Sequence, residues 1–223
     1  MLATLVLSVF LCGIAWGMAT SFPWAGRDTL DRLSYRKTIP PEFSEPIRTA
    51  LAHFPELQRV RILFRIRRAY TPLSTKPAFW SLFKRRNHRT YLVTISSQSI
   101  DTLSHLLYRN LNFTEQVGIM GHELSHVADF NSKNLLRSAA SALGHLSQRY
   151  LDRLEYRTDS ICICHGLGGY LEAYSRHVRT SMHVRYWRGV DHVFQPNDHW
   201  ERYMNPDTIE RHMQSATACR KPD

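Results

Sequence analysis

Residues 114–127 read TEQVGIMGHELSHV, and this stretch predicts the helix around which the chain folds. Its apolar residues recur every three or four positions, which is the spacing of one face of an α-helix. Thr114 can cap the start of the helix, and Gly118 and Gly121 allow a neighbouring element to approach its backbone closely. The predicted apolar stripe consists of Val117, Met120, Leu124 and Val127.

A short helix and two strands are predicted before this central helix. Residues 41–53 carry apolar side chains three or four positions apart, which indicates an amphipathic helix. In residues 59–67, apolar residues alternate with arginines, which predicts a half-buried strand with a cationic outer face. Residues 91–96 form a second strand by β-propensity. The proline-containing residues 71–89 between the strands are typical of a long exposed connection.

Helices are also predicted after the central helix. A leucine-rich stretch begins at Leu135 and is expected to end near Gly166, and residues 170–187 have a second helical pattern. A short helix is expected at residues 207–213 in the polar tail. The fold class that follows is α+β, mostly helical, with a small β-sheet next to the central helix.

The 223 residues are enough for one sizeable core, so a single domain is expected over residues 27–223. Residues 1–26 contain no charged side chain and are apolar from Leu2 through Trp16, which predicts a membrane anchor or a signal peptide. No basic residue precedes the apolar run, which favours the anchor, and the arginines that follow it would favour a cytoplasmic domain. A small-residue cleavage site near Ala19 keeps the exported alternative open.

The net charge of +10 is concentrated next to the apolar segment. Residues 27–89 contain 15 Lys and Arg against 5 Asp and Glu, whereas the remaining residues are balanced. This basic segment is either a solvated face or a surface held against anionic lipid, where each basic residue contributes about 1 kcal/mol. No nucleic-acid-binding motif accompanies the charge, so nucleic acid is not expected as a partner.

The cysteines do not indicate a disulfide framework. Cys12 lies in the apolar segment, which leaves an odd number, Cys162, Cys164 and Cys219, in the predicted domain. On a helix, the side chains of Cys162 and Cys164 would point about 200° apart. Buried apolar packing is therefore expected for them in preference to metal binding.

The central helix carries two histidines that can bind a metal. His122 and His126 lie one turn apart on the same face, which matches two corners of a tetrahedral zinc site. Glu123, next to the first histidine, can act as the general base towards a water at that metal. The alternative is two ordinary surface or core histidines.

The third ligand must come from another part of the chain, because no His-x-x-Gly-x-x-His extension follows His126. Glu155 and Asp159 are spaced to lie on one face of a second helix, and Glu155 is the expected ligand with Asp159 supporting His122. Asp159 as the ligand in place of Glu155 is the competing assignment, and an ion pair of Glu155 with a neighbouring arginine is another alternative. Asp129 can orient a ligand or cap a turn.

The segment Gly121–His126, followed by Glu155-x-x-x-Asp159, resembles the gluzincin metallopeptidases, in particular the minimal cores of the HtpX-like and CAAX-prenyl-protease membrane peptidases. The resemblance covers about residues 90–170 and implies a zincin-like core with Zn²⁺ as cofactor. It also implies that Glu155 is the third zinc ligand and that Asp159 supports the first histidine. In that family a strand beside the metal helix binds extended substrate, and residues 91–96 are placed to do so here. The several transmembrane helices of the HtpX-like proteins have no counterpart in this sequence.

The expected function is therefore zinc-dependent hydrolysis of a peptide or protein substrate, with Glu123 as the catalytic base and association with a membrane. The alternative is a membrane-tethered binding or scaffold protein that retains an inactive metalloprotease-like core. The sequence does not indicate the oligomeric state. A donor for the oxyanion is also expected after the third ligand. The candidates are His165, Tyr174, His177, His183 and Tyr186.

Overall fold

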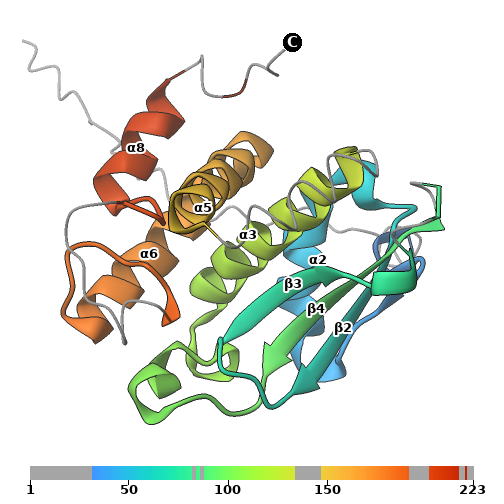
Figure 1. Ribbon diagram of the computed structural model, residues 1–223, viewed down its shortest axis with the longest axis horizontal. Helices are drawn as coiled ribbons and strands as arrows, with labels where there is room; N and C mark the ends of the chain where they lie inside the picture. Colours follow the sequence, from blue (N-terminus) through green and yellow to red (C-terminus); the bar gives the residue numbers. More distant parts are fainter. Residues whose placement is uncertain are drawn as a thin grey trace, which may run out of the picture.

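The predicted central helix is α3, which spans Phe113–Ser132 and runs through the middle of the fold (Figure 1). The computed structural model describes residues 32–81, 84–85, 88–133, 147–190, 201–215 and Cys219. All four residues of the predicted apolar stripe are fully buried. The elements that contact α3 include α2 (Ser44–Ala52), β3 (Leu73–Pro77), α5 (Gln148–Cys162) and α6 (Gly168–Met182).

The start of α3 differs from the expected cap at Thr114. Asn112 is the N-cap, because its side chain accepts a hydrogen bond from the Glu115 N–H while the Glu115 carboxylate accepts one from the Asn112 N–H. This reciprocal capping box satisfies two backbone N–H groups, those of Asn112 and Glu115, whereas a single threonine cap satisfies one. Thr114 lies within the first turn.

A four-stranded mixed sheet packs beside α3, in the order β1-β2-β4-β3. β1 (Lys37–Thr38), β2 (Arg61–Arg67) and β4 (Thr90–Ser96) are parallel, and β3 is antiparallel to β4. In Figure 1 the sheet lies in front of α2, and α3 runs beside β3. The predicted strands at residues 59–67 and 91–96 are confirmed as β2 and β4, and the helix at 41–53 as a 3₁₀ turn, Pro41–Phe43, followed by α2. The α+β class is confirmed.

The connection predicted at residues 71–89 was wrong in part, because it contains the edge strand β3. An edge strand tolerates prolines, since half of its main-chain groups have no partner in the sheet, and Pro77 ends this strand. The sheet order also contradicts the expectation that residues 91–96 bind substrate. β4 lies between β2 and β3, so neither of its edges can accept another strand.

The C-terminal helices pack on the other side of α3 from the sheet (Figure 1). α5 continues into a π-helical turn, Ile163–Leu167, in which Gly166 adopts a φ of 79°, and α6 follows after this kink. The helix expected to end near Gly166 is thus confirmed at its end, whereas residues 135–146 lie outside the described residues. The helix expected at residues 170–187 is α6, which ends earlier than expected, at Met182. The helix expected at 207–213 is α8 (Pro206–Gln214).

Two glycines explain how closely these helices approach α3. A Cβ atom at Gly118 would lie 2.1 Å from the carbonyl oxygen of Tyr170 on α6. A Cβ atom at Gly121 would lie 2.6 Å from the Leu167 side chain and 3.0 Å from the Cys162 sulfur. Larger residues at either position would push α5 and α6 away from α3, so the predicted role of both glycines is confirmed.

The cysteines correct the sequence-based expectation. Cys162 is buried in the core, as expected, but Cys164 is exposed and forms a disulfide with Cys219. The helical rotation between the two neighbouring cysteines accounts for the difference, because one side chain points inward and the other outward. The bond ties the residues after α8 to the junction of α5 and α6.

The disulfide predicts a measurable change in thiol content. Reduction of the denatured chain should add two maleimide labels, which peptide mapping should locate at Cys164 and Cys219. Mass spectrometry of the alkylated protein before and after reduction measures the number directly. The Cys164→Ser variant serves as the control, and its labelling should no longer increase by two. An unchanged label count in the wild type would show that the bond does not form.

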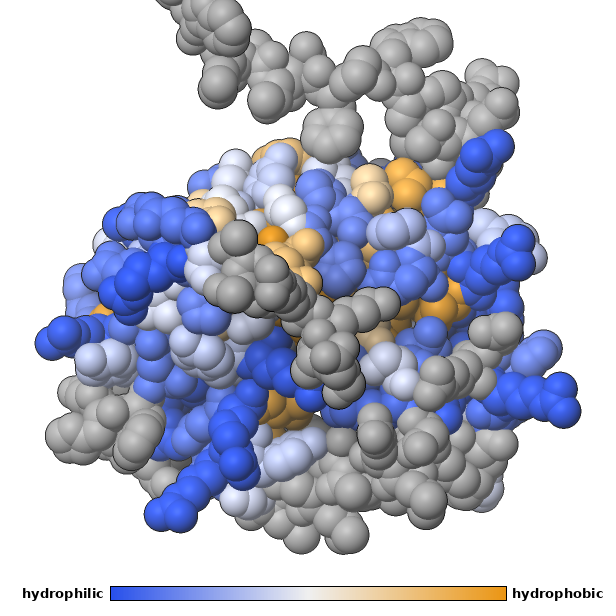
Figure 2. All heavy atoms as spheres, turned by 90° about the horizontal axis from the view of Figure 1, so that it is seen from above, coloured by the Kyte–Doolittle hydropathy of each residue, from blue (hydrophilic) through white to orange (hydrophobic). Residues whose placement is uncertain are grey.

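The surface is mostly hydrophilic on the face seen in Figure 2, where only small hydrophobic areas separate the polar side chains. Within the described part of the chain, no helix combines the length and hydrophobicity needed to cross a bilayer. The segment predicted as an anchor or signal peptide, residues 1–26, lies outside the described residues.

Candidate metal centre

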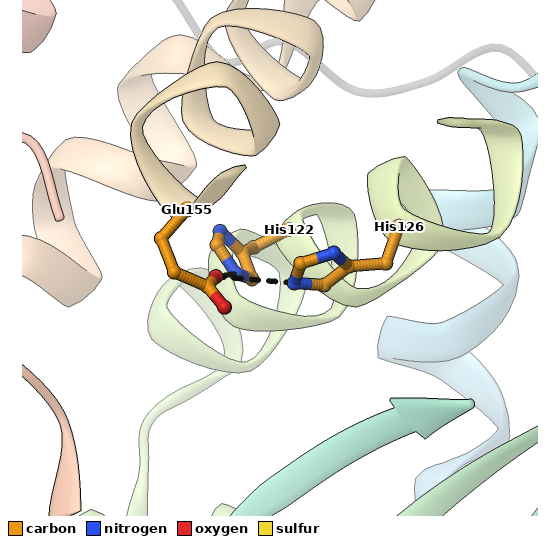
Figure 3. Close-up of side chains that lie close together, drawn as sticks. All are labelled: His122, His126 and Glu155. Carbon is orange, nitrogen blue, oxygen red and sulfur yellow. Dashed lines mark hydrogen bonds and ion pairs between the residues drawn. The ribbon is translucent and has the colours of Figure 1, made fainter. Parts of the chain in front are cut away.

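His122 and His126 project from the same face of α3 towards Glu155 on α5 (Figure 3). A single carboxylate oxygen, Glu155 Oε2, lies 3.1 Å from Nε2 of His122 and 3.1 Å from Nε2 of His126. The three ligand atoms all lie within 4.8 Å of one another. The structure therefore brings together the two histidines and the carboxylate that the sequence pattern singled out.

Asp159 holds His122 from the side opposite to Glu155. Its Oδ1 atom accepts a hydrogen bond from His122 Nδ1 at 2.7 Å, while its Oδ2 atom accepts one from the Met204 N–H at 2.7 Å. Asp159 is itself buried, so both contacts are shielded from water. This position is that of a support for His122, and Glu155 is the residue that faces both imidazoles. The alternative ion pair of Glu155 with a neighbouring arginine does not occur among the described residues.

His126 has a weaker support of the same kind. The Thr158 hydroxyl lies 3.3 Å from His126 Nδ1 and donates to the Leu154 carbonyl oxygen at 2.8 Å. Because Glu155, Thr158 and Asp159 lie on consecutive turns of α5, one helix supplies the facing carboxylate and both supports. The orientation of α5 against α3 thus determines the whole cluster.

The protonation of the histidines and of the carboxylates in this cluster depends on their contacts with one another. Burial would lower the pKa of His122, but its hydrogen bonds with Asp159 and Glu155 raise that pKa well above the usual value. Burial would raise the pKa of Glu155, but the positive charge of His126 and the hydrogen bonds from both imidazoles hold it well below the usual value. Both shifts have the same cause, which is the attraction between the imidazoles and the carboxylates that face them.

Glu123 is buried beside the cluster, and its Oε2 atom has no hydrogen-bond partner among the described residues. Its main-chain carbonyl accepts a hydrogen bond from the Thr75 hydroxyl on β3 at 3.3 Å, which links the helix to the edge strand. A buried carboxylate oxygen without a hydrogen-bond partner costs free energy of folding. Its presence indicates that Glu123 has a functional role or binds a partner in another state of the protein.

Glu123 and His122 line a cavity of about 100 Å³. Much of its remaining wall is apolar. The polar side chains that can donate a hydrogen bond there include Tyr174 and Tyr203, together with Thr71, Ser175 and Arg179. The ring of Tyr203 lies 5.6 Å from that of His122. The apolar residues of the wall include Leu106, Ile119, Leu171, Val178, Trp187 and Val190.

Both tyrosines keep their protons near the carboxylates. Burial raises the pKa of Tyr174, and the negative charge of Glu123 raises it further. Burial likewise raises the pKa of Tyr203 well above the usual value, with Glu155 as the next contributor. Phenols in this environment remain hydrogen-bond donors over the physiological pH range.

Tyr203 is not among the expected oxyanion donors, because it lies outside the segment directly after Glu155 that contains them. Among the five candidates from that segment, the cavity wall contains only Tyr174. His165 contacts Glu56 at 2.8 Å and His177 contacts Glu115 at 3.2 Å, so both are engaged elsewhere. His183 ends α6, and Tyr186 stacks against Arg185. Tyr203 lies more than 40 positions after Glu155 with no motif around it, and only folding brings it to the site.

Asp129 does not join the cluster. Its carboxylate is buried and forms ion pairs with Lys133 at 2.5 Å and with Arg157 at 3.2 Å. Since Arg157 belongs to α5, this contact ties the end of α3 to the helix that carries Glu155. Asp129 therefore positions α5, and none of its contacts with the described residues is with either imidazole.

The donor atoms fit a metal ion. In a tetrahedral zinc site with bonds of 2.0 to 2.1 Å, neighbouring ligand atoms are about 3.3 Å apart. The two 3.1 Å distances from Glu155 to the imidazoles are close to that separation. Two imidazoles and one carboxylate also leave a corner of the tetrahedron for water or substrate. The three residues thus form a candidate metal centre.

Comparison of the chain with protein-family models, with curated proteins and with solved structures finds no match.

Proposed function

We propose that this protein is a zinc-dependent metallopeptidase. The observation that carries the proposal is the convergence of His122, His126 and Glu155 beside a cavity that also contains the unpaired carboxylate oxygen of Glu123. A site with three protein ligands and an open position is typical of catalytic zinc, whereas structural zinc is closed by a fourth ligand. The described residues offer no fourth ligand in this cluster.

His122, His126 and Glu155 would hold the metal, and their mixed nitrogen and oxygen donors suit zinc. A zinc ion bound there would polarise the scissile carbonyl and lower the pKa of a water molecule. Asp159 fixes the tautomer of His122, because an Nδ1–H that donates to Asp159 leaves the Nε2 lone pair free for the metal. The Thr158 hydroxyl beside His126 Nδ1 can play the same part.

Glu123 is the proposed proton carrier. Its carboxylate accepts a proton from the attacking water and then delivers that proton to the nitrogen of the leaving amine. The free Oε2 atom supports this role, because a base whose oxygens were already paired would have to break a hydrogen bond first. Tyr203 and Tyr174 are the proposed donors to the oxyanion, since their phenols stay protonated and line the same cavity.

The edge strand β3 is the proposed docking site for the peptide backbone. The Ser96 N–H donates to the Pro72 carbonyl oxygen, and hydrogen bonding alternates along an antiparallel strand. The main-chain groups of Leu73 and Thr75 therefore point towards the outer edge, with which no described strand pairs. Leu73 also lines the cavity beside Glu123. A peptide added to this edge would lie extended next to the proposed base.

The proposal is tested with the zinc-loaded chain and a mixture of peptides of diverse sequence. Mass spectrometry should detect new peptide termini that disappear with a zinc chelator and return when zinc is restored. The apolar cavity wall predicts that residues with aliphatic side chains are enriched next to the cleaved bonds. Stoichiometric zinc without cleavage of any peptide would contradict the peptidase and would favour the alternative of a scaffold with a metalloprotease-like core.

The Cys164–Cys219 disulfide supports a location of the domain outside the cytoplasm, because disulfides persist in oxidising compartments. This inference opposes the cytoplasmic orientation that the arginines after the apolar segment favour. Either an exported protein or an anchored domain facing an oxidising compartment accommodates the disulfide.

A further inference from the structure

The strands β2, β3 and β4 belong to a stretch of unusual charge. Residues 57–100 contain ten Lys and Arg and no Asp or Glu. Among the described residues, no basic side chain of this stretch forms an ion pair with a carboxylate. Positive charge that no carboxylate of the described residues neutralises can attract an external anion where it is exposed.

The strand register places this charge on the face opposite to the helices. Ile62 and Phe64 of β2 are buried against the core, so the side chains at the alternate positions point to the other face. These are Arg61, Leu63, Arg65 and Arg67. Lys76 of β3 pairs with Leu92 of β4, which in turn pairs with Leu63 of β2, and all three therefore share that outer face. We define the outer sheet face by its basic residues, Arg61, Arg65, Arg67 and Lys76.

Exposed aromatic rings adjoin this face. Trp80 is 78% exposed and Phe79 is 65% exposed, and their rings are in edge contact at 5.1 Å. Their turn is fastened to the end of the sheet, because the Ala78 N–H and the Ser81 hydroxyl both donate to the Thr90 carbonyl oxygen. Residues that surround a hollow at the same Thr90 are Arg36, Arg61, Lys84, Arg85 and His88.

We propose that the outer sheet face and the Phe79–Trp80 turn dock onto a membrane surface rich in anionic phospholipid. Basic side chains attract the phosphate groups, and exposed Trp and Phe rings are stable at the level of the headgroups. The combination favours lipid over nucleic acid, since an apolar segment from Leu2 through Trp16 precedes the sheet in the sequence. β1, the first strand after that segment, pairs with β2 and so brings the chain to this sheet.

Docking in this orientation leaves the candidate metal centre uncovered. The cluster lies between α3 and α5, on the side of the sheet that carries the helices. The proposal is independent of the peptidase activity, because it depends only on the sheet and its turn.

The test uses Trp80 as a depth probe in the full chain, since the apolar N-terminal segment would itself bind vesicles and make simple co-sedimentation uninformative. The chain is reconstituted into vesicles of brominated phosphatidylcholine with or without phosphatidylglycerol. Subtraction of the Trp80→Phe signal isolates the quenching of Trp80. We expect quenching with the anionic lipid, reversal by high salt, and little quenching in neutral vesicles.

A triple variant, Arg61→Gln, Arg65→Gln and Arg67→Gln, should weaken this docking. Each basic residue contributes about fivefold, so the phosphatidylglycerol content needed for half-maximal quenching should rise steeply, with an affinity loss of roughly a hundredfold. The matched control removes three exposed arginines from the helical side, Arg153→Gln, Arg176→Gln and Arg185→Gln, and should quench like the wild type. Unchanged circular dichroism identifies variants that remain folded.

Three results would overturn the proposal. In the first, Trp80 of the wild type stays unquenched with anionic lipid. In the second, neutral vesicles and the sheet-face triple variant both give the same quenching of Trp80 as the wild type with anionic lipid. The third is a salt-sensitive fluorescence change of Trp80 with a single-stranded oligonucleotide but not with anionic vesicles, which would assign the face to nucleic acid.

Discussion

The Glu123→Gln variant should lose peptide hydrolysis while it keeps its zinc. Glutamine has nearly the same shape as glutamate but cannot accept the proton of the attacking water. Loss of a general base typically lowers the rate by a factor of about 10² to 10⁴. Because Glu123 is not one of the three residues that face each other in the cluster, zinc content should stay at the wild-type level. The cleavage rate and the zinc content are measured on the same preparation.

The matched control for this variant is Glu210→Gln, the same substitution at an exposed position of α8. It should leave both activity and zinc unchanged. Full activity of Glu123→Gln would refute the proposed base, and loss of zinc in that variant would mean that Glu123 belongs to the metal ligands.

The second large effect is expected for the Glu155→Ala variant, which should lose zinc. In the wild type, Glu155 Oε2 lies 3.1 Å from Nε2 of His122 and 3.1 Å from Nε2 of His126. The substitution therefore removes one of three donors and the only negative charge among them. Metal analysis after dialysis against a weak chelator measures the loss. The same variant should also lose hydrolysis, because the open metal position disappears with the metal.

Asp159→Asn serves as the graded comparison to Glu155→Ala. Asparagine keeps the shape of the side chain and its contact with the Met204 N–H but removes the charge beside His122. Loss of such a supporting group lowers metal affinity by about 10- to 100-fold, so this variant should retain zinc at high zinc concentration. Zinc retention in Glu155→Ala together with zinc loss in Asp159→Asn would reverse the assignment and make Asp159 the ligand.

The candidate site could be predicted from the sequence because its residues lie on two helices with regular spacing. His122 and His126 are four positions apart, as are Glu155 and Asp159, and that spacing alone puts each pair on one helical face. Local periodicity likewise predicted α3 and β2, and β-propensity predicted β4. The structure adds the arrangement of the two pairs, with Glu155 towards both imidazoles and Asp159 behind His122.

Several features could not be predicted because they depend on contacts between distant parts of the chain. β3 follows Pro72, ends at Pro77 and has little local pattern, and it forms a strand only because β4 offers it an unpaired edge. Tyr203 reaches His122 from a segment without a motif, held there in part by the hydrogen bond between Met204 and Asp159. The pairing of Cys164 with Cys219 likewise joins residues 55 positions apart.

The sequence by itself determined which helices form and which of their residues share a face, because helical rotation depends only on neighbours three or four positions away. The tertiary structure decided the order of the strands, the free edge at β3, the tyrosines beside the cluster and the disulfide. These depend on which surfaces pack together, and the close approach of α5 and α6 to Gly118 and Gly121 is what brings the two halves of the metal centre into contact.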